Sequence, residues 1–169
     1  HALSGGRYDS IVLVGYSMGA NISMKYLGTL GANAPRQIRA ASVFSAPCNI
    51  RAGADVLDRW DNFIYKYRFM LSLYRKIKLK AAQYPGKIDL ANFRKVRRWR
   101  DFDHHFSAPI SGYATMDEFH QEASAKNFLA EIRVPTLLVS AQNDPILTED
   151  CFPKELARDH DYFHFELTT

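Results

Sequence analysis

The stretch Gly15-Tyr16-Ser17-Met18-Gly19 holds the residue of this sequence best suited to nucleophilic chemistry. The pattern G-x-S-x-G is typical of a serine presented on a tight turn between a strand and a helix. Such a turn strains the serine backbone and crowds the residues two before and two after it, which favours glycine at both places. The N–H of Met18, at the start of the helix, would be one donor to an oxyanion.

The sequence around the motif supports this interpretation. An apolar, β-favouring run, SIVLV, precedes it, and a helix-like pattern, ANISMKYLG, follows it directly. The alternative is an ordinary serine that fills a tight turn between a strand and a helix.

A serine nucleophile needs a base, and the base needs an acid that orients it. Asp144 follows the apolar segment 136–140 by four residues, at a place where a turn is expected. Because it lies downstream of Ser17 and just beyond a predicted strand, we interpret it as the acid. The alternative is an Asp-Pro turn that leads into the next helix.

The base should be a histidine after the next predicted strand, residues 162–167, but none of the histidines is placed there. The sequence contains His1, His104, His105, His120, His160 and His164. We expect a structural role for each, and a position at the border of the substrate pocket is the alternative for His104 and His105.

Four apolar segments predict the strands that must position these side chains, at residues 10–14, 40–45, 136–140 and 162–167. The first three are almost continuously apolar, as in a parallel sheet that is covered by helices on both faces. The fourth alternates more and is expected nearer an edge. Helical patterns between the strands indicate β-α-β units.

Four further stretches predict helices. One is expected from about Met18 to Leu27, ending near Gly28. Another begins with a capping box, in which Thr115 is the N-cap and Glu118 reaches back to it. The interval from Ser45 to Thr136 is much longer than a crossover needs. It therefore predicts an insertion, with an aromatic and basic helix first and a second helix around residues 90–99.

Composition limits the class of protein. With 169 residues and 47% hydrophobic residues, the chain is long and apolar enough for one domain with a core. The net charge of +4 is mild and does not require nucleic acid. The two cysteines lack metal-binding or disulfide-rich spacing, and no apolar run is long enough to span a membrane. We expect no cofactor, no metal ion and a cytoplasmic location.

Several segments, taken in order, resemble the carboxyl-terminal portion of the YheT-type α/β-hydrolases. They are GYSMGANISMKYLG, AASVFSAP, FDHHFSAPISGYATMDEFHQEAS and IRVPTLLVSAQNDPI. The resemblance implies an α/β-hydrolase fold, a mostly parallel sheet flanked by helices, with the amino-terminal strands of the family missing. The core would comprise residues 1–50 and 126–169, and a helical cap about 51–125. Ala20 departs from the second glycine that the family often has.

The resemblance also implies that Ser17 is the nucleophile and Asp144 the triad acid, with the triad histidine just beyond Thr169. The predicted function is a serine hydrolase for carboxylic esters, including lipid esters, and this chain alone is expected to be inactive. An unpaired edge at the first strand is expected to reduce its solubility.

Other functions remain open at this stage. One is a catalytically silent scaffold that binds a lipid or a protein through its cap; a nucleotide-binding fold is disfavoured because GYSMGA lacks the third glycine. The basic runs RKIKLK and RKVRRWR are interpreted as solvated faces, with attraction to a membrane surface as the alternative. No nucleic-acid-binding module accompanies them.

Overall fold

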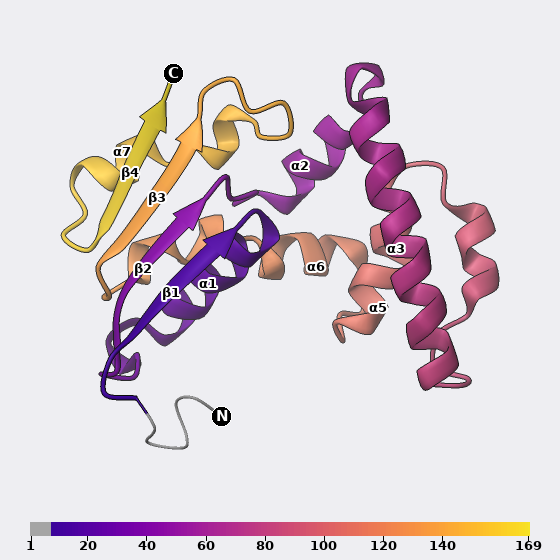
Figure 1. Cartoon of the computed structure of the whole chain (residues 1–169), viewed down its shortest axis with the longest axis horizontal. Coiled ribbons are helices and arrows are strands. Elements are labelled where there is room, and N and C mark those ends of the chain that lie inside the picture. Colours follow the sequence, from indigo (N-terminus) through magenta and orange to yellow (C-terminus); the bar gives the residue numbers. More distant parts are fainter. Residues whose placement is uncertain (1–7) are drawn as a thin grey trace. The chain divides into compact units, whose positions relative to one another are not determined.

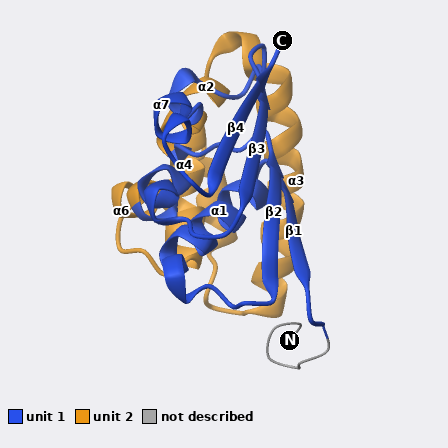
Figure 2. Cartoon of the chain, turned by 90° about the vertical axis from the view of Figure 1, so that its left-hand side faces the viewer, with its two compact units in different colours: residues 1–50, 122–169 blue, residues 51–121 orange. Residues whose placement is uncertain are grey.

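The fold was analysed in a computed structural model that describes residues 8–169. The chain divides into two compact units (Figure 2). The first comprises residues 1–50 and 122–169, and the second comprises residues 51–121.

The first unit is built on a four-stranded parallel sheet (Figure 1). Its strands are β1 (Ile11–Tyr16), β2 (Ile38–Phe44), β3 (Thr136–Ala141) and β4 (Phe163–Thr168). They lie in the order β1-β2-β3-β4, so the four predicted strands are confirmed within two residues at each end. The expectation that the fourth strand lies at an edge is also confirmed, and within residues 8–169 β1 pairs only with β2.

Helix α1 (Met18–Leu30) and the short helix α7 (Lys154–Arg158) pack on the same side of this sheet (Figure 2). The core beneath them is apolar and includes Met24, Leu27, Val43, Leu138 and Phe163. Burial of these side chains is the main contribution to the stability of the unit.

The sheet is parallel and flanked by helices, as predicted, but within residues 8–169 one of its faces carries exposed apolar side chains. On the face opposite α1, Val12, Val14 and Tyr16 of β1 are more than half exposed, and Leu137 of β3 is 40% exposed. These side chains alternate with the buried ones along each strand. An apolar run therefore predicted a strand correctly but did not show what covers each face.

Helix α1 ends three residues later than predicted. Gly31, with φ 51°, follows its last residue and takes the backbone conformation that suits glycine. Gly28 has a different role, because a Cβ atom there would lie 2.1 Å from the carbonyl oxygen of Phe128. The glycine allows α1 to approach the 3-10 helix Ala125–Glu131 closely.

The second unit is helical. Its longest element is α3 (Phe63–Gln83), which follows α2 (Ile50–Leu57) and the 3-10 turn Trp60–Asn62. The predicted helix at 90–99 is instead a 3-10 helix, Leu90–Lys95, followed by extended residues and α4 (Trp99–Phe102). Asp89 caps the 3-10 helix by accepting a hydrogen bond from the N–H of Ala91.

The remaining helices of this unit are the π-helix Asp103–Ser107, α5 (Ala108–Ile110) and α6 (Met116–Ala123). The predicted capping box is present at the start of α6. The hydroxyl of Thr115 accepts from the N–H of Glu118, and the Glu118 carboxylate accepts from the N–H of Ala114, one residue earlier than predicted. A small core of Ile77, Phe102 and Phe106 holds α3 against the segments that follow it.

Candidate active site

Ser17 lies between β1 and α1 in a strained conformation. Its φ of 51° and ψ of −121° are almost those of Gly31, with φ 51° and ψ −126°. A residue with a Cβ atom adopts such angles at a cost of about 1–3 kcal/mol, so the surrounding structure must hold it there. The N–H of Ser17 donates to the carbonyl of Phe44 on β2 at 2.9 Å, which fixes the turn to the neighbouring strand.

The two glycines of the motif are not equivalent. A Cβ atom on Gly15 would lie 2.8 Å from the carbonyl oxygen of Gly19 and 2.9 Å from the backbone of Ala20, so only glycine fits there. At Gly19 a Cβ atom would meet nothing within 4 Å. The expectation that crowding requires both glycines is therefore wrong for Gly19.

The amino-terminal end of α1 lies at Ser17. The Ser17 carbonyl accepts from the N–H groups of Ala20 and Asn21, which begins the helical hydrogen bonding. Within residues 8–169, the N–H of Met18 has no hydrogen-bond acceptor, and the first turn of the helix contains no acidic residue. A group with negative charge beside Ser17 would therefore meet an available N–H and the positive end of the helix dipole.

Asn21 supports this helix in a way that sequence reasoning missed. It is 1% exposed, its side-chain amide donates to the carbonyl of Ala123 at 2.8 Å, and its side-chain oxygen accepts from the N–H of Ala125 at 2.9 Å. The first turn of α1 is thus tied to a segment about a hundred residues later. An asparagine on an otherwise apolar helix face was the available signal.

Asp144 lies three residues beyond β3, because that strand is one residue longer than predicted. Its backbone N–H donates to the carbonyl of Ala141, and its carboxylate accepts from the N–H of Ile146 at 2.9 Å. The second bond is typical of an Asp-Pro turn, which was the alternative interpretation of Asp144. That interpretation describes the local hydrogen bonding of Asp144 correctly. Ser17 and Asp144 both follow carboxyl ends of strands in one sheet, with β2 between them.

A second strained serine, Ser45, was not singled out from the sequence. It follows β2 directly, has a φ of 47°, and donates its N–H to the carbonyl of Val139 at 2.9 Å. Ser17 and Ser45 therefore lie at the same edge of the sheet on adjacent strands. The only available signal was its position at the end of a predicted strand.

The described histidines have local contacts. His160 accepts hydrogen bonds from the N–H groups of Tyr162 and Phe163 and so shapes the turn before β4. His120 is buried and bonds to Asp103 at 2.9 Å.

His104 and His105 are neighbours in the π-helix. The pKa of His105 is lowered, first by its partial burial and then by the proximity of His104 and Lys95. His164 lies exposed on β4, and His1 lies outside the described residues.

The two cysteines are poorly suited to be nucleophiles. Cys48 and Cys151 are both buried and both in the free thiol form. Burial, with a smaller contribution from nearby Cys151, raises the pKa of the Cys48 thiol to about 12. The reactive thiolate of Cys48 is therefore scarcely populated at neutral pH.

Comparison with known proteins agrees with this geometry. The family model of the serine aminopeptidases, S33 (Hydrolase_4), matches residues 2–158. The chain is 35% identical over 144 residues to the putative esterase YheT of Escherichia coli and covers 42% of that protein. These residues are 83% of the present chain.

Two animal relatives are similar over comparable lengths. The chain is 30% identical to mouse phospholipase ABHD3, with 85% of the chain and 35% of the relative covered. It is 29% identical to human monoacylglycerol lipase ABHD2, with 93% and 40% covered. The chain thus spans about two fifths of the length of the relatives it matches. With a matching family model and a parallel α/β sheet, this chain belongs to the serine aminopeptidase S33 family of α/β-hydrolases and is a YheT-like, esterase- and lipase-like member of it.

Proposed function

We propose that the protein hydrolyses carboxylic esters through a covalent acyl-serine intermediate, with Ser17 as the nucleophile. The backbone of Ser17 is the observation that carries the proposal. It is a non-glycine residue in a glycine conformation, it is exposed, and a 13-residue helix begins immediately after it. Strain of this kind persists where the surrounding structure enforces it, and it is concentrated at functional sites.

In the proposed reaction, the Ser17 hydroxyl attacks the ester carbonyl and transfers its proton to a histidine base, which the described residues do not supply. The N–H of Met18 donates to the oxyanion that forms. The histidine then protonates the leaving alcohol, and a water molecule, deprotonated by the same base, releases the acid from Ser17.

Asp144 is proposed to orient that histidine. Neighbouring strands are about 4.8 Å apart, so the strands that lead to Ser17 and Asp144 are separated by roughly 10 Å across β2. Such a separation leaves room for an imidazole between the two side chains. The Asp-Pro turn that holds Asp144 would then keep its carboxylate in place.

The substrate class that we propose is the lipid ester. Relatives are named as a phospholipase and a monoacylglycerol lipase, and both names describe enzymes that act on lipids. We further propose that residues 51–121 act as a cap that shapes the substrate pocket.

The test is labelling of the protein, at its full natural length, by a fluorophosphonate, which reacts with activated serines. We expect labelling of the wild type and of Ser23→Ala, a half-buried serine on α1 whose hydroxyl donates to the carbonyl of Gly19, but not of Ser17→Ala. Asp144→Asn should label much more slowly. Equal labelling of Ser17→Ala would contradict the proposal. Absence of labelling in the wild type would favour a silent scaffold that binds a lipid or a protein.

A further inference from the structure

Helix α3 is unusually exposed for its length. Of its 21 residues, only Ile77 is buried. Met70 and Leu73 pack against the same small core, so Met70, Leu73 and Ile77 define the inward side of the helix at helical spacing. Most of the remaining helix surface is exposed.

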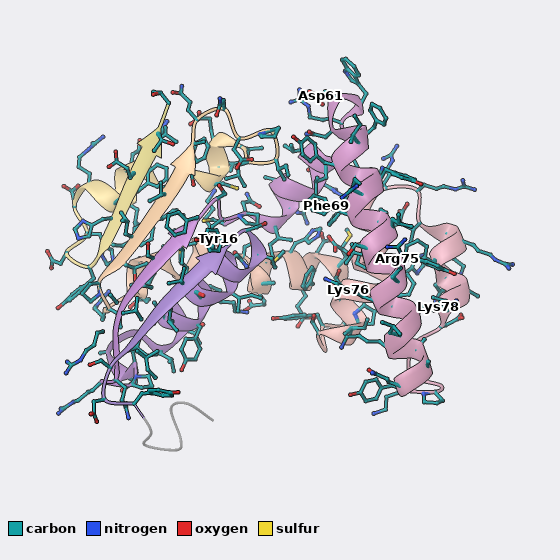
Figure 3. The ribbon with its side chains drawn as sticks, viewed as in Figure 1. Tyr16, Asp61, Phe69, Arg75, Lys76 and Lys78 are labelled. Carbon is teal, nitrogen blue, oxygen red and sulfur yellow. The ribbon has the colours of Figure 1, made fainter. Side chains whose placement is uncertain are left out.

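The charge on this helix has a single sign. It contains six basic residues and no acidic residue: Lys66, Arg68, Arg75, Lys76, Lys78 and Lys80. Lys66 is paired with Asp58 at 2.6 Å. No ion pair or hydrogen bond is found for the other five side chains within the described chain, and all five are exposed. Figure 3 shows Arg75, Lys76 and Lys78 along the carboxyl-terminal half of α3.

Apolar and aromatic side chains lie between these charges. Ile64, Leu71 and Leu79 alternate with Arg68 and Arg75 at intervals of three or four residues, so all five lie on the side opposite Ile77. The most exposed large side chains of the helix and its entry turn are Trp60 (86% exposed), Phe63 (64%), Ile64 (59%), Tyr67 (67%) and Leu79 (65%). Such exposure of large apolar groups marks an interaction surface.

The segment that packs beside α3 extends the positive charge. Arg94, Lys95, Arg97 and Arg98 are all exposed. The carboxylate of the nearby Asp101 accepts the backbone N–H groups of Arg97 and Arg98. Residues 63–100 contain only one acidic residue, Asp89, which caps the 3-10 helix.

We infer that α3, with Trp60 at its start, is a docking surface for the anionic surface of a phospholipid bilayer. Lysine and arginine are attracted to the anionic headgroups of a membrane surface. Tryptophan and tyrosine are enriched at the level of the lipid headgroups. Leucine and isoleucine side chains insert at the boundary between the headgroups and the acyl chains. Charge and apolar groups on one side of a helix fit a bilayer surface, which offers both phosphate and hydrocarbon.

The helix lies on the bilayer and does not cross it. No helix within residues 8–169 is long and apolar enough to span a membrane. Docking through α3 would hold the second unit at the source of lipid esters. The inference does not depend on ester hydrolysis, since binding is measured without turnover.

The test is co-sedimentation of the protein, at its full natural length, with vesicles of phosphatidylcholine alone or mixed with phosphatidylserine. The variant Arg75→Gln/Lys76→Gln/Lys78→Gln removes three exposed charges for which residues 8–169 offer no ion-pair partner. We expect it to weaken partition onto the mixed vesicles by at least about tenfold. Raising the salt from about 0.1 M to about 1 M should weaken binding of the wild type similarly.

A second variant, Trp60→Ser/Leu79→Ser, tests the apolar part and should weaken binding several-fold. The matched control is Arg36→Gln/Arg39→Gln/Arg158→Gln, which removes the same charge from exposed positions of the first unit and should retain binding within about twofold. Equal weakening by the control would overturn the inference, since net charge alone would then suffice. So would absence of vesicle binding, or preferential binding of a duplex oligonucleotide.

Discussion

The turns after β1 and β2 each contain a serine with a strained backbone, but the surroundings of the two serines differ. Ser17 and Ser45 both have positive φ, and each donates its N–H to a carbonyl of the next strand at 2.9 Å. Ser17 is exposed, and α1 starts at the next residue. After Ser45 the chain continues through buried Ala46 and Cys48, and no helix begins before Ile50.

The difference teaches that strain alone does not identify a nucleophile. A strained serine becomes reactive where solvent and substrate reach its hydroxyl and where free N–H groups and a helix dipole face the developing negative charge. The turn after β1 is exposed and is followed directly by α1, as the proposal requires. The turn after β2 has the strained angle but is not followed directly by a helix, so it serves as an internal control for the proposal.

The largest expected effect is on kcat, and it distinguishes Ser17 from Ser45. Ser17→Ala should lower kcat for an ester substrate by at least about 10³-fold, since it removes the group that attacks. Ser45→Ala should change kcat by less than about tenfold, because this hydroxyl is not assigned to the reaction. Steady-state ester hydrolysis by the full-length protein measures both. Equal losses would make Ser45 part of the reacting site.

The next largest expected effect is on the free energy of unfolding, and it concerns the two glycines of the turn after β1. Gly15→Ala should destabilise the fold by about 1–3 kcal/mol or more, because the new Cβ meets backbone atoms at 2.8–2.9 Å. Gly19→Ala should be neutral or stabilise by about 0.5–1 kcal/mol, because it places a better helix former in open space. Urea unfolding measures the difference. A destabilising Gly19→Ala would show that both glycines are needed after all.

Substitution of Asn21 tests how much its two hydrogen bonds stabilise the first turn of α1. Asn21→Ala should cost about 1–3 kcal/mol, since it leaves the carbonyl of Ala123 and the N–H of Ala125 without these partners. Asn21→Asp keeps the acceptor for Ala125 and should retain part of the stability. Thermal unfolding of both variants checks this. No loss in either variant would mean that water replaces the two bonds.

Much of the first unit could be predicted from the sequence because its geometry restricts residue types. Apolar runs marked the strands, and the G-x-S-x-G pattern marked the turn at Ser17. In the second unit, Thr115 and Glu118 marked the start of α6. These are local signals, each set by backbone hydrogen bonding or by steric limits.

The remainder depends on contacts between distant segments. Gly28 was interpreted as a helix end, but its lack of a side chain serves the approach of Phe128, which no local pattern reveals. The 3-10 helix at 90–95 has apolar spacing similar to that of an α-helix. The exposure of α3 could not be read from its sequence, since its aromatic side chains suit either a buried or a surface helix. Ser45 had no motif around it.

The smallest effect concerns Cys48, in the segment after Ser45. The folded-state pKa of about 12 is above the ordinary value of 9.0, so the unfolded chain loses this proton first as the pH rises. The resulting stability is present below pH 9.0 and declines above it, by about 1 kcal/mol at pH 10. Unfolding free energies at pH 8 and pH 10 should therefore differ less in Cys48→Ala than in the wild type. An unchanged difference would contradict the account of its burial.

The most direct test of the central claim is the site of covalent modification. The full-length protein, treated with a fluorophosphonate and digested, should contain a single modified peptide in mass spectrometry, with the phosphonate on Ser17. Attachment to Ser45 or to another serine, with Ser17 unmodified, would contradict the assignment of the turn after β1 as the nucleophile.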